Sequence, residues 1–132
     1  MLKLDISEPV SGYMTRGIIS IESSAPISKA AKIITETNAP LLIVMKNNKP
    51  VGTIAEHEML LRTVAGDTDP ATAIESIINP NIITISGNAT IKEALTLMAE
   101  KNINHLIVQS KGKLIGVFSP LNLLDLGKVK IW

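Results

Sequence analysis

Apolar residues along the chain follow two patterns, and each pattern occurs twice. Short isoleucine-rich runs at residues 18–21 and 82–85 are typical of β-strands. After each run, apolar residues recur at the i, i+3, i+4 and i+7 spacing of an amphipathic helix. These positions are Ile27, Ala30, Ala31 and Ile34 in the first half, and Ile91, Ala94, Leu95 and Met98 in the second. Thr90 and Glu93 form a capping-box sequence that predicts the start of the second helix.

Two further apolar stretches follow each helix and predict a β-hairpin. The predicted strands span residues 41–45 and 49–54 in the first half, and residues 105–109 and 113–118 in the second. Polar, turn-forming residues at 46–48 and 110–112 join them. A last helix is predicted to begin near Glu56 in the first half and near Pro120 in the second. Each half therefore has the predicted order βαββα.

Displacing the sequence by 64 residues aligns the two halves without a gap. The matches include types that shared secondary structure does not require: Glu36 with Glu100, Asn38 with Asn102, Lys49 with Lys113, and Gly52 with Gly116. One register that matches all of these indicates a duplicated unit. A unit of about 55 residues is small to fold alone. We therefore expect an α+β fold of two βαββα repeats, packed on each other with pseudo-two-fold symmetry.

The clearest loop in the chain is the polar segment from Gly66 to Pro70. It separates the two halves, and it sets the expected boundaries. These are residues 7–65 for the first repeat, 66–73 for a linker and 74–127 for the second repeat.

Composition excludes several classes of partner. The net charge is +1, from 13 basic and 12 acidic residues, and there is one each of Tyr, Phe and Trp. Such a chain lacks both the charge and the stacking surface for nucleic acid, and Lys128 and Lys130 are interpreted as a solvated tail. The apolar runs are too short to span a membrane, so membranes are not expected partners either. No signal-peptide core is found at the start, and a cytoplasmic location is expected.

Catalytic constellations are missing from the sequence. Absence of cysteine excludes thiolate chemistry, disulfides and Cys-type zinc sites. His57 and His105 occupy different places in their repeats, and neither has an acidic residue at metal-ligand spacing. No phosphate-binding loop or nucleophile elbow occurs. We therefore expect no enzyme activity, no metal and no required cofactor.

The junction between the last strand and the last helix is more informative. In the second half, Ser119 suits a helix N-cap and Pro120 the first helical position. A well-made helix start needs no ligand, and that is one interpretation. The other is a binding site, in which the helix start and the Ser119 hydroxyl hold a phosphate while the Asn122 amide holds a vicinal diol.

The whole repeat resembles the cystathionine β-synthase (CBS) domain, which occurs in tandem pairs called Bateman modules. The resemblance rests on the element order and on the family pattern Gly-h-h-Thr/Ser-x-x-Asp/Asn, where h is apolar. Gly116, Ser119 and Asn122 fit this pattern. The first half has Gly52 but then Ala55 and Glu58, so the hydroxyl is missing and the acidic residue is longer. Ile43 and Ile107 stand where the family usually has proline in the middle strand.

The resemblance implies two ligand clefts, each lined by both repeats. Residues implied for the better cleft are Gly17, Ile19, Ala39, Pro40, His105, Gly116, Val117, Ser119, Leu121 and Asn122, with Met14 beside them. Residues implied for the weaker cleft are Ile83, Ile103, Asn104, Ala55 and Glu58. Ordinary core packing remains the alternative for Ile19 and Ala39, and a structural histidine remains the alternative for His105.

The resemblance predicts a stand-alone regulatory module that binds an adenosine nucleotide and signals to a separate, unknown effector protein. Expected ligands are AMP, ADP, ATP or S-adenosylmethionine. It also implies a homodimer through the apolar last helices, at Met59, Leu60 and Leu61 and at Leu121, Leu123 and Leu124. The alternative is a structural oligomerisation module whose clefts are vestigial.

Overall fold

The fold is seen in a computed structural model, which describes residues 5–124. Predictions that concern Lys128, Lys130 and the end of the second repeat at Gly127 lie outside the described residues. The chain divides into two compact units. We call residues 18–82 the central unit, and residues 5–17 together with 83–124 the terminal unit.

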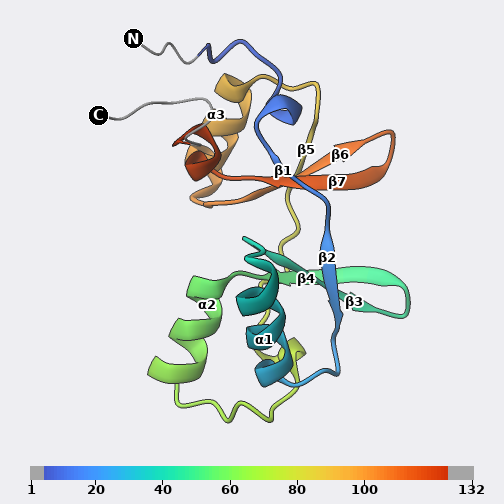
Figure 1. The fold of residues 1–132 in the computed structure, drawn as a ribbon, viewed down its shortest axis with the longest axis vertical. Helices are drawn as coiled ribbons and strands as arrows, with labels where there is room; N and C mark the ends of the chain where they lie inside the picture. The colour runs from blue at the N-terminus through green and yellow to red at the C-terminus, as the bar shows by residue number, and fades with distance from the viewer. Residues whose placement is uncertain (1–4, 125–132) are drawn as a thin grey trace. The chain divides into compact units, whose positions relative to one another are not determined.

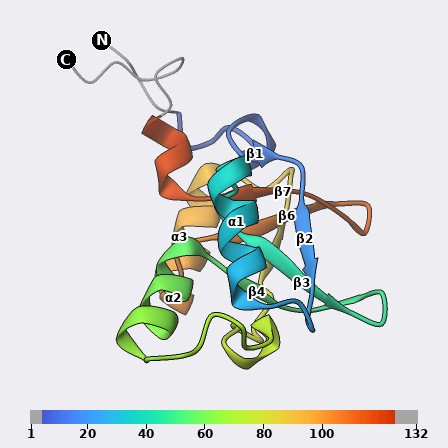
Figure 2. The same ribbon diagram turned by 60° about the horizontal axis from the view of Figure 1, so that its bottom comes forward.

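The central unit is a three-stranded sheet with two helices beside it (Figure 1). Its strands are β2 (Ile19–Glu22), β3 (Leu42–Lys46) and β4 (Lys49–Ile54), in that order across the sheet. Strand β2 is parallel to β3, and β3 is antiparallel to β4. Its helices are α1 (Ile27–Thr37) and α2 (Glu56–Leu60), with a π-helical turn at Leu61–Ala65 and a 3₁₀ turn at Ile74–Ser76. Helices α1 and α2 lie side by side in both Figure 1 and Figure 2.

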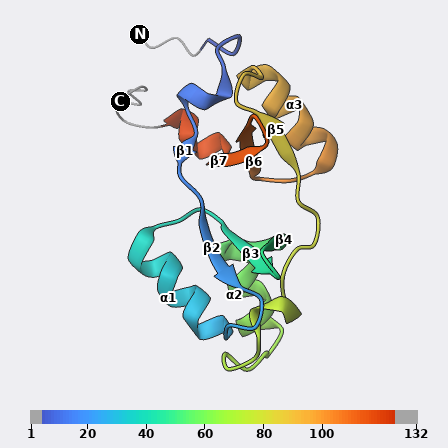
Figure 3. The ribbon, with the colours of Figure 1, turned by 90° about the vertical axis from the view of Figure 1, so that its right-hand side faces the viewer.

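The terminal unit repeats this plan and adds one short strand (Figure 3). Its sheet has the order β1 (Thr15–Arg16), β7 (Lys113–Phe118), β6 (Leu106–Ser110) and β5 (Thr84–Ser86). Its helices are α3 (Ile91–Lys101) and two 3₁₀ turns at Val10–Gly12 and Pro120–Leu124. The predicted α+β class with two sheet-and-helix repeats is confirmed.

Each hairpin turns through two residues rather than the three that the sequence predicted. Asn47 and Asn48 have φ values of 52° and 61°, and Lys111 and Gly112 have values of 52° and 80°. Two successive positive φ values are those of a type I′ turn, whose twist matches that of the flanking strands. Strands β3 and β6 therefore continue one residue further than predicted.

The matched asparagines of the 64-residue register end the long helices. Asn38 caps α1 with a φ of 55°, and Asn102 caps α3 with a φ of 53°. Asparagine tolerates this left-handed conformation better than most residues, which explains the match. At the start of α3, the Thr90 hydroxyl accepts a hydrogen bond from the Glu93 N–H at 3.1 Å, which is one of the two bonds of the predicted capping box.

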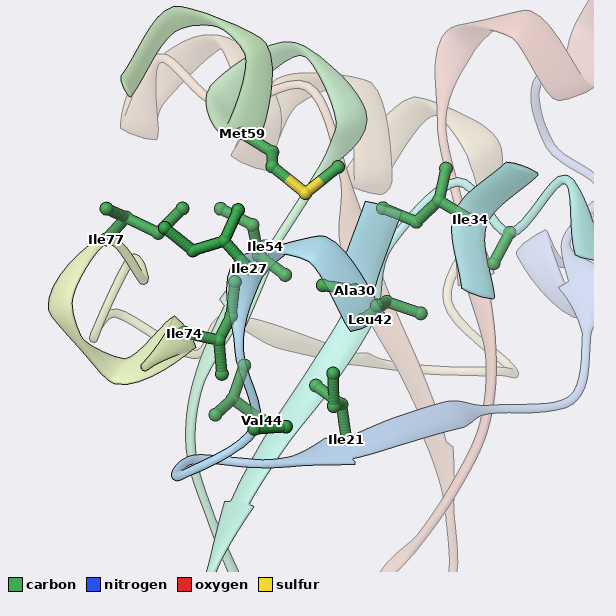
Figure 4. Packing of buried hydrophobic residues seen from close by; sticks show 12 residues of the cluster. Ile21, Ile27, Ala30, Ile34, Leu42, Val44, Ile54, Met59, Ile74 and Ile77 are labelled. Carbon is green, nitrogen blue, oxygen red and sulfur yellow. The ribbon is translucent and has the colours of Figure 1, made fainter. Parts of the chain in front are cut away.

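Each unit has its own aliphatic core. In the central unit, Met59 reaches from α2 toward the side chains of α1 and the sheet, among them Ile27, Ile34 and Ile54 (Figure 4). In the terminal unit, fully buried residues such as Ile91 and Phe118 take the corresponding positions. Burial of these side chains fixes which face of each helix meets its sheet.

The first segment of each repeat packs in the unit that contains the rest of the other repeat. In the terminal unit, Val10 N–H donates to the Ala89 carbonyl at 2.7 Å, and Ile91 N–H donates to the Glu8 carbonyl at 3.0 Å. In the central unit the equivalent bonds run from Ile74 to Ala25 at 2.7 Å and from Ile27 to Thr72 at 2.9 Å. The sequence did not predict this exchange. It also shows that Thr72, assigned to the linker, hydrogen-bonds the start of α1.

Beside β4, Asn79 takes the place that Thr15 has beside β7. Asn79 and Thr53 exchange two backbone hydrogen bonds, each 2.9 Å long. Thr15 likewise pairs with Val117 in an antiparallel register. Within residues 5–124, no helix has the length and apolar character that crossing a membrane requires.

Candidate functional site

Ser119 and Asn122 form a compact polar group where β7 ends. The Asn122 Oδ1 atom accepts a hydrogen bond from the Ser119 N–H at 2.8 Å, and the Asn122 N–H donates to the Ser119 carbonyl at 3.0 Å. Among residues 5–124, the Ser119 hydroxyl has no hydrogen-bond partner. The sequence placed Ser119 correctly at the start of a helical segment. However, the Asn122 side chain makes the capping bond, because the 3₁₀ turn pairs the Asn122 N–H with a carbonyl instead of the hydroxyl.

The Asn122 amide has a second partner, which the sequence did not predict. Its Nδ2 atom donates to the Thr15 Oγ1 atom at 3.0 Å. Thr15 lies on β1, whose pairing with β7 brings it to this junction. The amide is therefore held at both of its polar atoms. Only the exchange of first segments places Thr15 here, and no local sequence pattern indicates that exchange.

Gly116 is required by the close approach of β1. A Cβ atom at this position would lie 2.5 Å from the Thr15 carbonyl oxygen and 2.7 Å from the Met14 sulfur. In the central unit, a Cβ atom at Gly52 would lie 2.6 Å from the Asn79 carbonyl oxygen. The glycine of the family pattern thus has a packing reason in both units, independent of any ligand.

The matching junction of the central unit has different chemistry. Ala55 is buried and offers no hydroxyl, while the Glu58 Oε1 atom accepts a hydrogen bond from the Ala55 N–H at 3.3 Å. Glu56 adds a second carboxylate on the exposed side. The Asn79 amide is engaged elsewhere, since its Oδ1 atom accepts from the Asn81 N–H at 3.0 Å. This junction is therefore capped in the same way but presents negative charge.

The other predicted site residues divide between the two units. Gly17, His105, Val117 and Leu121 belong to the terminal unit with Ser119, and Gly17 N–H donates to the Ile115 carbonyl at 2.9 Å. Ile19, Ala39 and Pro40 belong to the central unit. For the second predicted cleft, Ile83, Ile103 and Asn104 belong to the terminal unit, while Ala55 and Glu58 belong to the central unit. Assembly of either complete cleft stays a prediction.

Burial varies among these residues. Val117 is 3% exposed and Ala39 is 8% exposed, so both contribute to packing, whereas Leu121 is 75% exposed. His105 is half-buried, immediately before β6. In the part of the chain that the structure describes, no three His, Cys, Asp or Glu side chains are grouped as metal ligands would be.

Comparison with known proteins identifies the repeated unit. The family model of the CBS domain matches residues 10–65 and 74–128. The uncharacterized protein MJ0653 of Methanocaldococcus jannaschii is 32% identical over 93% of this chain and 64% of its own length. The CBS domain-containing protein YhcV of Bacillus subtilis is 22% identical over 82% of this chain and 77% of its own.

Solved structures agree in fold. An uncharacterized conserved protein from Pyrococcus horikoshii has a TM-score of 0.86 at 25% identity, with 98% of both chains covered. A hexameric CBS-CP12 protein from bloom-forming cyanobacteria has a TM-score of 0.80 at 22% identity, over 89% of this chain and 69% of its own. The chain spans less than two thirds of some relatives, including MJ0653 and, at 44% of its length, the uncharacterized protein MK0525 of Methanopyrus kandleri. The two matched spans cover most of the sequence and both structural repeats, and the chain therefore belongs to the CBS domain family as a tandem pair.

Proposed function

We propose that this chain is a regulatory module that binds an adenosine nucleotide at Ser119 and Asn122 and acts on a separate effector protein without catalysis of its own. The observation that carries the proposal is the Ser119 hydroxyl, which has no hydrogen-bond partner among residues 5–124 and lies beside an amide held at both of its polar atoms. A free hydroxyl donates to phosphate or ribose oxygens, and an amide both donates to and accepts from ribose hydroxyls. Candidate ligands are AMP, ADP, ATP and S-adenosylmethionine.

The difference between the two junctions supports Ser119 as the better site. A phosphate near Ala55 would find no hydroxyl and would face the carboxylates of Glu56 and Glu58. Like charges at short range oppose binding, and the phosphate could not offset this with a hydrogen bond at Ala55. Binding at a ratio of one nucleotide per chain is therefore expected before any second site fills.

Thermal unfolding with a panel of the four ligands tests the proposal. A ligand at 100 times its dissociation constant stabilises the folded state by about 2.7 kcal/mol. The double variant Ser119→Ala/Asn122→Ala should lose this stabilisation. The matched control is Ala55→Ser, at the other junction, which should keep it. Nucleotide binding would be contradicted if none of the four ligands raised the unfolding temperature of the wild-type protein and mass spectrometry found no co-purified nucleotide. That outcome would favour vestigial clefts.

A second candidate function, association, has its own observation. Large apolar side chains are exposed on the last helical segments: Leu60 at 60%, Leu61 at 56%, Val64 at 72%, Leu121 at 75% and Leu124 at 52%. Beside α1 and α2 of the central unit lies a groove of about 430 Å³, lined by Ile27, Ala31, Ile34, Met59, Leu60 and Val64 among others. Exposed apolar surface of this kind favours contact with another protein surface.

We propose that a second copy of the chain covers this surface and forms a homodimer. Because each copy presents the same exposed side chains, a two-fold contact would bury the apolar side chains of both copies at once. Light scattering at micromolar concentration measures the mass directly. Leu61→Lys should shift the protein toward the monomer, whereas Asn88→Lys, at an exposed polar position on the turn before α3, should not. A wild-type monomer would contradict the dimer.

A further inference from the structure

The hydrogen bond from Asn122 to Thr15 joins residues 107 positions apart in the sequence. We propose that Thr15 is a positioning residue, which sets the ligand preference of the Ser119 site by fixing the Asn122 amide. The inference rests on the proposed function, because the preference concerns a ribose-containing ligand. Thr15 itself need not contact the ligand for this role.

Counting hydrogen bonds shows what the fixed amide leaves for a ligand. An asparagine side chain has two donor hydrogens on Nδ2 and two acceptor lone pairs on Oδ1. The Ser119 N–H takes one lone pair, so Oδ1 must be on that side. Thr15 Oγ1 then accepts one Nδ2 hydrogen. One donor and one acceptor remain side by side, in a fixed orientation.

A donor beside an acceptor suits a vicinal diol. Each ribose hydroxyl can both donate and accept, so one hydroxyl pairs with Oδ1 while the other accepts from Nδ2. A 2′-deoxyribose leaves one of these groups without a partner, and a site built to bond a hydroxyl discriminates against its absence. A carboxylate such as Glu58 only accepts, so it does not make this combined contact.

The central unit lacks an equivalent of the Thr15 contact. Asn79 takes the position of Thr15, but its amide oxygen accepts from Asn81 and it makes no side-chain bond to Glu58. Glu58 is held at one oxygen only, by the Ala55 N–H at 3.3 Å. Hydrogen bonds at both polar atoms of the side chain proposed to bind the diol are therefore a property of the terminal unit.

Thr15→Val tests the inference because it removes the hydroxyl and keeps the branched shape that suits β1. Titration calorimetry with AMP and with 2′-deoxy-AMP measures the preference for ribose. We expect Thr15→Val to weaken AMP binding by about three- to tenfold and to reduce the preference for AMP over 2′-deoxy-AMP. Thr15→Ser keeps the hydroxyl, so it should keep both the wild-type affinity for AMP and the preference for AMP over 2′-deoxy-AMP. Thr84→Val, an exposed position on β5, is the matched control and should change neither.

The preference for AMP over 2′-deoxy-AMP distinguishes a positioning role of Thr15 from a purely structural one. Lower stability of Thr15→Val with an unchanged AMP preference would overturn the inference and leave the proposed function standing. If the wild-type protein binds none of the candidate nucleotides, the proposed function and this inference both fail. NMR of the nucleotide-free wild-type protein gives a measurement that needs no variant. Slowed exchange of one Asn122 side-chain amide proton is expected, and rapid exchange of both would overturn the inference.

Discussion

The junctions at Ser119 and at Ala55 share a backbone design but differ in every side chain that a ligand would meet. In both, a segment from the other repeat passes so close to the last strand that only glycine fits, at Gly116 and Gly52. In both, a side-chain oxygen three residues on caps the first N–H. What differs is the hydroxyl of Ser119 and the neutral amide of Asn122, which the junction at Ala55 lacks. Duplication kept what folding requires, and it left the ligand-facing chemistry free to diverge.

This comparison also divides the family pattern into two kinds of residue. The glycine and the capping oxygen have a structural task in each unit, so their presence alone does not indicate a ligand. The Ser119 hydroxyl makes no hydrogen bond to the described residues, and the Thr15 contact has no counterpart at Glu58. These two features therefore carry the functional argument.

Replacing the two glycines should give the largest effect and should affect both junctions alike. We expect Gly116→Ala and Gly52→Ala each to lower the free energy of unfolding by about 2–3 kcal/mol, because the added methyl group meets a backbone carbonyl. Gly12→Ala, where a Cβ atom would have nothing within 4 Å, is the control. Urea unfolding measures all three. A cost at only one junction would show that the two close approaches are not equivalent.

Removing the capping side chain should lower the nucleotide affinity at the Ser119 junction and not at the Ala55 junction. Asn122→Ala should weaken AMP or ATP binding at least about tenfold, since it removes the ribose contact and the group that orients it. Glu58→Ala should leave affinity nearly unchanged. Titration calorimetry provides the comparison. Equal losses, or a larger loss for Glu58→Ala, would mean that the central junction is the better site.

The same two variants should differ less in stability than in binding. Asn122→Ala removes two side-chain hydrogen bonds, and Glu58→Ala removes one long one. We expect Asn122→Ala to be the more destabilising by about 0.5–1 kcal/mol in the free energy of unfolding. Thermal unfolding without nucleotide measures the difference. A larger loss for Glu58→Ala would show that its capping bond is the stronger.

The smallest expected effect concerns the exchanged segments themselves. The Glu8 carboxylate accepts a hydrogen bond from the Tyr13 hydroxyl at 3.0 Å and raises the pKa of Tyr13 above its usual value. The matching position in the central unit is Ile77, which cannot titrate. The folded state thus keeps a proton that the unfolded state loses first. This contribution to stability is present below about pH 10 and is lost as the pH rises through the raised pKa.

Tyr13 is the only tyrosine, so its ionisation is read directly by ultraviolet absorbance. Glu8→Gln should lower the pKa of Tyr13 toward its usual value, and Glu36→Gln on α1 should not. An unchanged value in Glu8→Gln would mean that the hydrogen bond does not persist in solution.

Sequence patterns predicted the repeated elements well because periodicity and capping act over a few residues. Strands β3 and β6 begin one residue later than expected, and the helices at residues 27 and 91 occur where the apolar stripe placed them. Matched residues such as Asn38 and Asn102 marked a backbone requirement that is visible in the sequence once the register is known.

The exchange of first segments was not predictable by the same reasoning. Residues 6–17 and 70–81 occupy equivalent positions in the 64-residue register. Local patterns therefore do not decide whether each segment packs with its own repeat or with the other one. The Thr15–Asn122 contact was missed for this reason. The capping role of Asn122 was missed because the choice between a 3₁₀ and an α-helical turn depends on local geometry that composition does not reveal.

The exchange also has a consequence for the order in which the protein matures during synthesis. The central unit, residues 18–82, is one continuous stretch, so all of its partners have left the ribosome before the second repeat is complete. The terminal unit needs β1, which precedes the central unit in the sequence, and β7, which follows it. Its sheet therefore closes last, and β1 stays without its partner strand until then. A chain cut off and released after residue 82 would hold every segment of the central unit but would leave β1 unpaired, as an edge that invites pairing with another chain.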